Sequence, residues 1–263
     1  MMTIREYARP ATLEEAWQLN QKKPNRVLGG MLWLKMEKIN VGTAIDLSAL
    51  GLDTIEETDT EIIIGAMATL RDLETNAALN AYTAGAVREA VRHIVGVQFR
   101  NCATVGGSIY GRFGFSDVLT LFLALDAAVE LHHGGTVPLA EYAARPYERD
   151  ILTHIVVPKQ PGKVAYLAQR NISTDFPVLT CAVAVRADGV RCAIGARPMK
   201  AQLYTGDPAL LAGGITPESA AAFGESIAAE VPFGSNLRAG ADYRRAVCKV
   251  LVRRALLACK EDA

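Results

Sequence analysis

The alternation of hydrophobic and polar positions predicts a mixed succession of short helices and strands. Thr12 and Glu15 have the spacing of an N-terminal capping box, so a helix is expected to run from there to about Gln21. Thr69 and Asp72 repeat that spacing and predict a second, shorter helix. Apolar runs bounded by turn residues predict strands at 26–28, 43–47 and 62–64. A small β-α-β-like unit is therefore expected first, and a second unit should begin near Glu61.

The middle of the chain keeps this mixed pattern. Apolar residues at helical spacing predict helices over 84–97 and 117–125. A strand over 127–131 should turn at His132-His133-Gly134-Gly135, and another is expected over 151–157. Residues 159–162 have the composition of a turn or linker, which predicts a domain boundary there.

The last hundred residues predict antiparallel sheet followed by helices. Asp188-Gly189 suits a tight hairpin between strands at 178–186 and 190–195. The final helix is expected over 242–260, with Tyr243, Val247, Val250, Leu251 and Leu257 on its buried face. Its other face should carry Arg244, Arg245, Lys249, Arg253 and Arg254. A solvated charged face is favoured there over a docking surface for an acidic partner.

Composition removes several classes of function. Half of the 263 residues are apolar, and 28 basic side chains balance 28 acidic ones, so neither nucleic acid nor an anionic membrane is an expected partner. The most apolar stretch, 119–131, is interrupted by Asp126 and is too short to span a bilayer. The acidic N-terminus lacks the apolar core of a secretory signal, so a cytoplasmic location is expected.

Cysteine and histidine give no convincing metal site. The five cysteines are widely spaced without a C-x-x-C pair, and are interpreted as reduced core thiols. The four histidines are expected to be structural or solvated rather than ligands: His93, His132, His133 and His154. No acid, base or nucleophile constellation is evident, so no catalytic residue is assigned.

Two glycine doublets carry the remaining chemistry, because the usual NAD, ATP, esterase and zinc-protease motifs are absent. Gly29-Gly30 lies in V-L-G-G-M-L-W, and Gly106-Gly107 in N-C-A-T-V-G-G-S. A glycine doublet after an apolar strand can point successive backbone amides outward as an anion-binding nest suited to a pyrophosphate. On spacing alone, ordinary turns are the favoured interpretation.

A family resemblance changes that balance. The second doublet, with S-D at 116–117 and A-L-D-A at 124–127, resembles R-N-x-A-T-[IV]-G-G-N followed by S-D and A-L-D-A in the FAD-binding medium subunits of molybdenum hydroxylases. These are the relatives of xanthine dehydrogenase and carbon monoxide dehydrogenase. The first doublet resembles their A-G-G-T-x-L loop, and 61–69 resembles their strand before G-A-x-x-T. The order and spacing agree through residue 200.

The resemblance implies an α+β fold of three parts. Two FAD-binding subdomains would occupy 1–55 and 56–160, and a smaller domain with a three-stranded antiparallel sheet and helices would occupy 161–263. Both doublets would wrap the FAD pyrophosphate. The residues it implies as cofactor-binding are Leu28, Gly29, Gly30, Met31, Leu32, Trp33, Thr104, Val105, Gly106, Gly107, Ser108, Asp117, Leu152 and Phe176.

For three of these residues, more than one role is possible. Asp117 would accept hydrogen bonds from a ribose or nearby backbone, and an N-cap role with Ser116 is equally physical. Phe176 would lie against the isoalloxazine or belong to the core. Leu152 would mark backbone contacts to the adenine or flavin.

Three positions depart from the family pattern. Met31 replaces the usual Thr, Ser108 the usual Asn, and Ala168 a Lys found in several relatives. Side-chain hydrogen bonds to the cofactor would be lost at Met31 and Ser108 while a backbone nest survives. At Ala168, the tuning of the flavin reduction potential or the contact with an incoming acceptor would differ. No histidine follows Gly29-Gly30, so non-covalent FAD is implied.

The implied function is electron transfer within a larger complex. A molybdenum-cofactor large subunit and a 2Fe-2S small subunit would be partner chains, and FAD here would pass electrons to NAD or another acceptor. A degenerate assembly or docking subunit without flavin is the alternative, and a stand-alone flavoenzyme is a third. The substrate would be selected on a partner chain.

Overall fold

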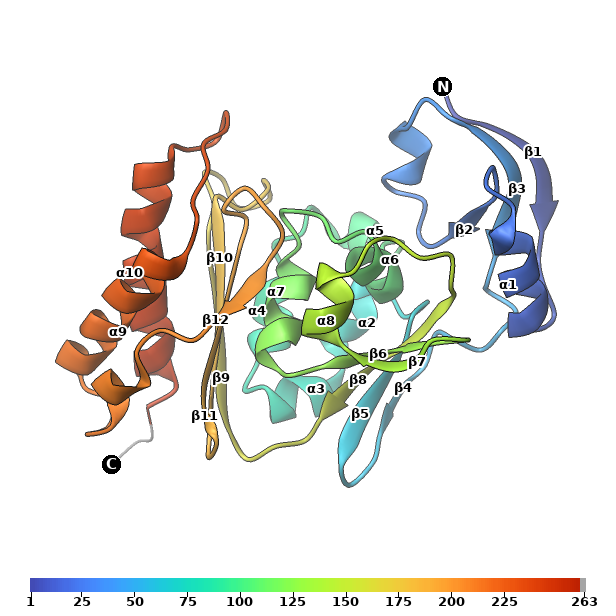
Figure 1. Cartoon of the computed structure of the whole chain (residues 1–263). Helices are drawn as coiled ribbons and strands as arrows, with labels where there is room; N and C mark the ends of the chain where they lie inside the picture. Colours follow the sequence, from blue (N-terminus) through green and yellow to red (C-terminus); the bar gives the residue numbers. More distant parts are fainter. Residues whose placement is uncertain (261–263) are drawn as a thin grey trace.

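The N-terminal unit is a small parallel sheet with one helix against it (Figure 1). The structure is a computed structural model that describes residues 1–260. The sheet has the order β1-β3-β2, and both of its pairings are parallel. Its elements are β1 (Thr3–Ala8), α1 (Leu13–Gln21), β2 (Arg26–Leu28), the 3-10 helix η1 (Leu34–Met36) and β3 (Asn40–Asp46). The predicted helix and both predicted strands are present, and β1 is an additional strand.

Local capping explains where α1 begins. The Thr12 hydroxyl accepts a hydrogen bond from the Glu15 amide, as the spacing predicts. The Glu15 carboxylate reaches back to the amide of Ala11, one residue before the cap. Ala16 and Trp17 then pack with Ile151 of the second unit, so this helix joins the two units.

The second unit is a five-stranded antiparallel sheet, with helices from the long β5–β6 connection packed beside it (Figure 1). Its strand order is β4-β5-β8-β6-β7. The strands are β4 (Ile55–Glu57), β5 (Glu61–Gly65), β6 (Ala128–Leu131), β7 (Gly135–Pro138) and β8 (Leu152–Pro158). The helices of that connection are α2 (Leu70–Thr75), α3 (Ala77–Tyr82), α4 (Ala86–Val91), α5 (Val97–Arg100), α6 (Val105–Tyr110) and α7 (Asp117–Ala124). A further helix, α8 (Leu139–Ala144), lies between β7 and β8.

The single helix predicted over 84–97 is wrong. The chain forms only α4 there, preceded by left-handed residues at Ala84 and Gly85 and followed by another at Val95. A left-handed residue cannot continue a right-handed helix. The apolar spacing identified the buried side of α4 but did not indicate the break that lets α5 start in a new direction.

A buried ion pair fixes that break. Arg100 donates from Nε to Glu74 Oε2 at 2.7 Å and from Nη2 to Oε1 at 3.3 Å, and both residues are buried. Arg100 Nη1 also donates to the carbonyl of Ile94 at 3.2 Å. Burial alone would raise the pKa of Glu74, but the hydrogen bonds and charges of Arg100 and Arg71 hold that pKa below its ordinary value.

Glu74→Gln is therefore expected to destabilise the chain by about 3 kcal/mol at neutral pH, because Arg100 keeps a buried charge without its carboxylate. The folded pKa of Glu74 is depressed, so the wild-type advantage exists above the unfolded pKa and is lost as pH falls through the folded pKa. The measurement is the unfolding free energy of both proteins in chemical denaturant at pH 7 and at pH about 4; the difference between them should be smaller at the lower pH. A difference that grows on acidification would contradict it.

The C-terminal unit is an antiparallel sheet with two long helices on one face (Figure 1). The order is β12-β11-β10-β9, so the sheet has four strands rather than the predicted three. The α+β fold class and the hairpin at Gly189 are confirmed. The elements are β9 (Gly162–Gln169), β10 (Leu179–Arg186), β11 (Gly189–Gly195), β12 (Gln202–Tyr204), the 3-10 helix η2 (Pro208–Leu211), α9 (Pro217–Glu230) and α10 (Ala241–Ala258).

Strand β10 is buried on both of its faces. Leu179, Cys181 and Val183 pack toward α9 and α10, while Ala182 and Ala184 belong to the core of the second unit. Helix α7 contacts the second face of the sheet. The second and third units therefore share a continuous core, and the segment 166–176 lies beside the helices of the second unit.

The buried face of α10 differs from the predicted one. Tyr243 and Val250 are exposed, whereas Arg244, Cys248 and Val252 are buried. Arg244 belongs to the core rather than to a basic surface stripe: its guanidinium donates to the carbonyls of Val178, Gly234 and Ala239 and to Asn236 Oδ1. Because Arg244 is buried, α10 turns a different side toward the sheet from the one that apolar spacing predicts.

The thiols largely follow expectation. All five cysteines are free; Cys181, Cys192, Cys248 and Cys259 are buried and Cys102 is exposed. Burial raises the pKa of the Cys259 thiol to about 11, so this thiol stays protonated and behaves as a small apolar core residue.

Candidate functional site

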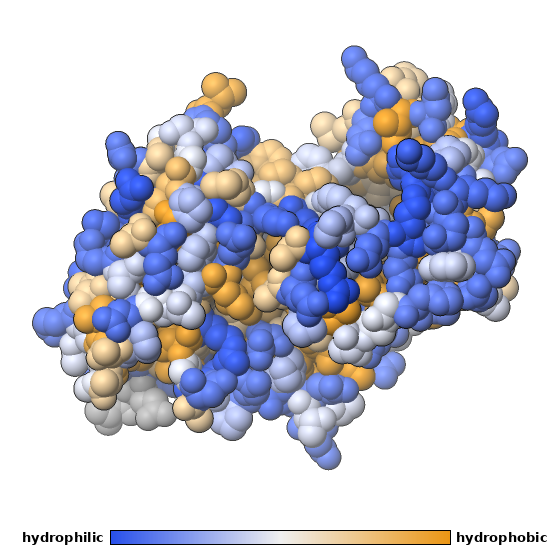
Figure 2. Space-filling view, viewed as in Figure 1, coloured by the Kyte–Doolittle hydropathy of each residue, from blue (hydrophilic) through white to orange (hydrophobic). Residues whose placement is uncertain are grey.

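Two adjoining cavities lie between the N-terminal unit and the second unit. Their volumes are about 330 Å³ and about 390 Å³, in the range of small-molecule sites. The surface is visibly hollowed between the N-terminal unit and the rest of the chain (Figure 2). The cavities share the walls formed by Arg26, Val27, Gly29, Thr104, Gly107, Tyr110 and Tyr147. A single elongated ligand could therefore occupy both.

The first glycine doublet lies at the boundary between the cavities and offers free donors. Gly29 and Gly30 directly follow β2, which brings the chain to the cleft. Within residues 1–260, the backbone N–H groups of 29–32 have no hydrogen-bond partner. Met31 has a φ of 58°, in the left-handed region. Successive free amides beside a left-handed residue are the features of an anion-binding nest, and this loop has both of them.

The second glycine doublet is built differently from the prediction. Gly106 and Gly107 lie in the first turn of α6, and their amides are used inside the protein. The Gly106 amide donates to the carbonyl of Ala66, and the Gly107 amide to the hydroxyl of Thr104. Val105 and Ser108 amides donate to Ala68 and Thr104 carbonyls. This stretch is a closely packed wall of the cavities, and the expectation of a second outward-pointing nest is corrected.

Glycine is needed at these positions because backbones approach closely. A Cβ on Gly30 would lie 1.8 Å from the carbonyl oxygen of Cys102, and one on Gly106 would lie 2.6 Å from that of Ala66. A Cβ on Gly29 would meet Thr104 Oγ1 at 2.7 Å. The two doublets therefore pack against one another or against neighbouring backbone, and together they hold the first loop in place.

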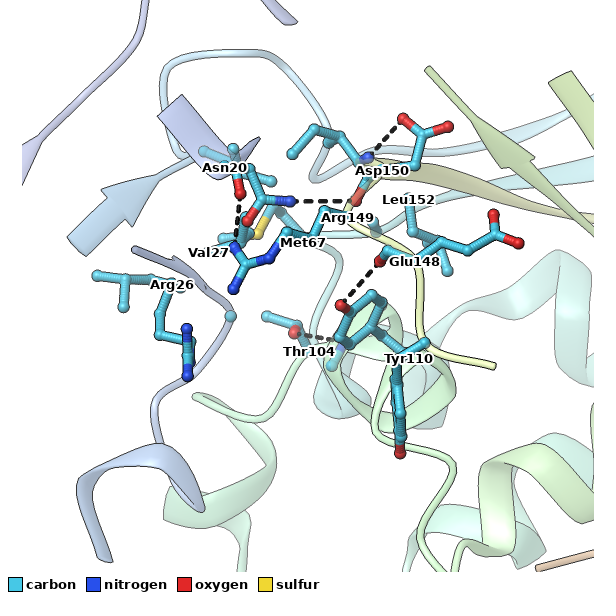
Figure 3. Close-up of a pocket in the computed structure, with 18 of the residues that line it drawn as sticks. Asn20, Arg26, Val27, Met67, Thr104, Tyr110, Glu148, Arg149, Asp150 and Leu152 are labelled. Atoms are coloured by element: carbon cyan, nitrogen blue, oxygen red, sulfur yellow. Dashed lines mark hydrogen bonds between the residues drawn. The ribbon is translucent and has the colours of Figure 1, made fainter. Parts of the chain in front are cut away.

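The first cavity is lined by β8 and by the segment before it (Figure 3). Leu152 is buried in its wall, next to Ile151. The Tyr110 hydroxyl donates to the carbonyl of Glu148 at 3.2 Å, which ties α6 to this segment. Burial raises the pKa of Tyr110, so its hydroxyl remains a donor at neutral pH.

Arg149, in the segment before β8, lines the same cavity and contacts the end of α1 (Figure 3). Its guanidinium donates to the carbonyl of Asn20 at 2.6 Å and to that of Lys23 at 2.6 Å. Gln21 returns a hydrogen bond to the Arg149 carbonyl at 2.7 Å. The segment 145–151 was missed by sequence reasoning, since nothing in its composition marks it as part of a site.

Aromatic side chains gather at the second cavity. Trp33 lies 5.7 Å from Phe176 and 5.3 Å from Phe115, measured between ring centroids. Phe115 and Phe113 are stacked at 5.2 Å. The Arg238 guanidinium lies 4.7 Å above the Phe176 ring. Phe176 is thus half-buried in an aromatic cluster with Trp33, which lines the cavity, and its contact with the isoalloxazine stays a prediction.

Asp117 lies at the edge of the second cavity, but its carboxylate is used internally. It accepts hydrogen bonds from the Tyr166 hydroxyl and from the Arg170 guanidinium. Burial raises the pKa of Asp117, and the Arg170 charge opposes that rise. The α7 cap is Ser116, whose hydroxyl accepts from the Leu119 amide. Both hydrogen bonds go to Oδ1, so Asp117 holds β9 and the following loop against α7.

The three departures from the family pattern have distinct places. Met31 lines the second cavity in its left-handed conformation. The Ser108 hydroxyl donates to the Thr104 carbonyl at 3.0 Å, inside the protein. Ala168 pairs with Thr180 in the C-terminal sheet and lines a separate, shallower depression near His93. Only Met31 and Ser108 therefore belong to the second cavity.

Two family models together match almost the whole chain. Residues 2–160 match the FAD binding domain in molybdopterin dehydrogenase. Residues 165–259 match the CO dehydrogenase flavoprotein C-terminal domain. The cavities and both glycine doublets lie within the first match.

Known proteins align with the chain from end to end. It is 29% identical to the uncharacterised protein YgfM of Escherichia coli (strain K12), with 98% of this chain and 97% of that one covered. It is 26% identical to the nicotine 6-hydroxylase medium subunit of Paenarthrobacter nicotinovorans, with 95% of each covered. The structure of carbon monoxide dehydrogenase from Hydrogenophaga pseudoflava lacking the Mo-pyranopterin moiety superposes with a TM-score of 0.87 and 27% identity, covering 97% of this chain and 96% of that one.

No helix within residues 1–260 is long and apolar enough to cross a membrane.

Proposed function

The chain belongs to the family of the FAD binding domain in molybdopterin dehydrogenase, and we propose from this that it is the electron-transfer subunit of a multi-subunit molybdenum hydroxylase. It would take electrons from iron-sulfur clusters on a partner chain and pass them to NAD or another acceptor. Membership makes it an FAD-binding oxidoreductase subunit of the medium-chain type. The complex, the electron route and the acceptor are the proposal.

The observation that supports this most directly is the run of free amides at 29–32. They line a cavity inside the region that matches the FAD-binding domain. Four adjacent N–H donors without protein partners suit the phosphate oxygens of a dinucleotide, which need several donors at once. Gly30 and Gly106 lie so close to neighbouring backbone carbonyls that a side chain would not fit at either position, and these contacts hold the loop in place.

The surrounding residues would orient the cofactor. The loop Leu28–Leu32 would hold the pyrophosphate from one side, and the wall 104–108 would confine it on the other. Trp33 and Phe176 would lie against the isoalloxazine, and Leu152 would bound the adenine end. Asp117 would act indirectly, by holding Arg170 and the 170–176 loop beside the second cavity.

The chemistry would come from the cofactor. FAD supplies the exchange of one or two electrons, which links single-electron iron-sulfur carriers to a two-electron acceptor. The residues of this chain bind and orient it and restrict access of water. The molybdenum cofactor and the 2Fe-2S clusters would reside on a large and a small partner chain, so substrate selection would lie outside this chain.

A docking subunit without flavin is the alternative function. It is favoured by Met31 and Ser108, which stand where the family pattern has hydrogen-bonding side chains, and by the internal use of the Ser108 hydroxyl. The free amide run supports the FAD-binding function instead, because four adjacent donors that face a cavity suit the phosphate oxygens of a dinucleotide.

Purification of the chain from its native host through a C-terminal tag tests the proposal. The expected product is a complex with a molybdenum-containing chain and a 2Fe-2S chain, whose visible spectrum combines flavin and iron-sulfur absorbance. A stoichiometric complex without flavin would establish the docking alternative. A flavin-containing chain that is active alone with a small substrate would establish a stand-alone flavoenzyme.

A further inference from the structure

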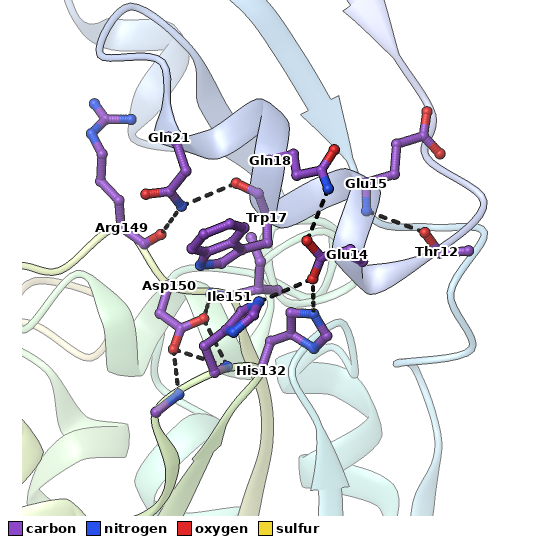
Figure 4. A network of polar contacts seen from close by, with 12 residues as sticks. Thr12, Glu14, Glu15, Trp17, Gln18, Gln21, His132, Arg149, Asp150 and Ile151 are labelled. Atoms are coloured by element: carbon purple, nitrogen blue, oxygen red, sulfur yellow. Dashed lines mark hydrogen bonds and ion pairs between the residues drawn. The ribbon is translucent and has the colours of Figure 1, made fainter.

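Three metal-ligating side chains meet outside the cofactor cleft, where α1 faces the β6–β7 turn (Figure 4). Glu14 Oε2 lies 3.2 Å from His132 Nε2 and 3.0 Å from His133 Nε2. All three potential ligand atoms lie within 4.8 Å of one another. None of these residues lines either cavity.

Glu14 is held ready by its own helix. Gln18, one turn along α1, donates from Nε2 to Glu14 Oε1 at 2.9 Å and leaves Oε2 directed at the two imidazoles. A solvent-accessible glutamate is ionised at neutral pH, so Oε2 can bind a cation. An ionised carboxylate with one oxygen fixed by a neighbour is the usual state of a metal ligand.

The two histidines are held by packing and by the turn that carries them. The His133 ring lies against Trp17 of α1, with centroids 4.2 Å apart. Asp150 accepts from the amide of His133 and, at 2.7 Å, from the amide of Gly134. The His132 amide donates to the carbonyl of Ile151 at 2.9 Å. The turn is therefore positioned before any ion binds (Figure 4).

We propose that Glu14, His132 and His133 bind one Zn²⁺ ion, with water in the fourth position. Two imidazoles and one carboxylate form a ligand set that Zn²⁺ accepts readily, whereas Mg²⁺ and Ca²⁺ prefer oxygen alone. In a tetrahedral zinc site, neighbouring ligand atoms lie roughly 3.3 Å apart. The two carboxylate–imidazole distances are close to that value. Glu14 and His133 are about half exposed, so ions reach the site from solvent.

The ion would link the N-terminal unit to the second unit. Glu14 belongs to the N-terminal unit, and both histidines lie in the β6–β7 turn of the second unit. Arg149 already ties the far end of α1 to the second unit through the carbonyls of Asn20 and Lys23. A metal at Glu14 would secure the opposite end of this helix. The proposal does not depend on flavin binding.

Zinc titration of the full chain tests this inference. The protein is prepared untagged, without metal-affinity resin, and freed of metal with a chelator. Calorimetry should show one equivalent of Zn²⁺ bound, and Co²⁺ in its place should give the intense visible bands of a four-coordinate site. His133→Asn and Glu14→Gln should each weaken binding by more than about 100-fold, and Gln18→Ala by roughly 10-fold, as expected for loss of a ligand and of a ligand's support.

His154→Asn is the matched control. His154 forms a similar pair with Glu130, at 3.0 Å between Nδ1 and Oε2, but has no second imidazole beside it. This variant should bind Zn²⁺ as the wild type does. Zinc should also raise the thermal unfolding temperature of the wild type and of His154→Asn but not that of His133→Asn. Absence of saturable zinc uptake, or equal affinity in His133→Asn, would show that the cluster is only a set of histidine–carboxylate ion pairs.

Discussion

Gly30→Ala is expected to weaken FAD binding by at least about 100-fold. The added Cβ would lie 1.8 Å from the Cys102 carbonyl oxygen and 2.6 Å from its carbon, and both are backbone atoms that cannot rotate away. The loop must therefore move off its support. Losing two hydrogen bonds to a charged ligand, at roughly 1.5 kcal/mol each, corresponds to about 100-fold in Kd. Trp33 lines the second cavity, so its fluorescence should report FAD titration directly.

Gly213→Ala is the control for this experiment. Nothing lies within 4 Å of a Cβ at Gly213, and its backbone is outside the left-handed region. This variant should bind FAD as the wild type does. Circular dichroism of both variants must match the wild type, because a collapsed fold would also abolish binding. A folded Gly30→Ala variant with unchanged affinity would place the pyrophosphate away from the first doublet.

Arg244→Met should destabilise the chain by about 3–5 kcal/mol, because it removes several hydrogen bonds from a buried charged group, each worth roughly 1–3 kcal/mol. The wild-type side chain is fully buried and donates to three backbone carbonyls and to Asn236 Oδ1. Methionine fills a similar volume without donors, so all four hydrogen bonds would be lost, and the Val178 carbonyl would lose its donor in the core. Both tryptophans, at 17 and 33, lie in the N-terminal unit. The unfolding of the C-terminal unit is therefore best followed by far-ultraviolet circular dichroism.

Arg253→Met provides the comparison on the same helix. Arg253 is exposed on α10, so its replacement should change the unfolding free energy by no more than about 0.5 kcal/mol. Equal effects of the two substitutions would contradict the structural role assigned to Arg244 and would restore the interpretation of a basic surface stripe.

Local signals in the sequence predicted local structure well. The caps at Thr12 and Thr69 begin helices as expected, and Asp188-Gly189 forms the predicted hairpin. These features depend on hydrogen bonds and backbone angles within a few residues, so the sequence contains all the information they need.

Features that depend on distant partners could not be predicted in this way. Arg244 is buried because carbonyls from 178, 234 and 239 converge on it, which no periodicity reveals. The amides of 105–108 are satisfied by Ala66, Ala68 and Thr104, so the second doublet became a packed wall instead of a nest. The early end of α4 depends on left-handed residues and on the pair between Glu74 and Arg100.

The candidate site was predicted in part. The glycine doublets and Phe176 do border the two cavities or their aromatic rim. The segment around Arg149 was not foreseen, since its contribution depends on carbonyls at the end of α1. The histidines of the β6–β7 turn were assigned structural or solvated roles, and only the fold shows that Glu14 of a different unit lies beside both of them.

The most direct test of the account is a stoichiometric FAD titration of the isolated chain, after removal of any cofactor it carries from the cell. We expect saturation at one FAD per chain, with quenching of Trp33 and flavin bands in the visible spectrum of the product. A folded chain that stays colourless and binds no added FAD would contradict it. That result would leave the docking subunit as the function of this fold.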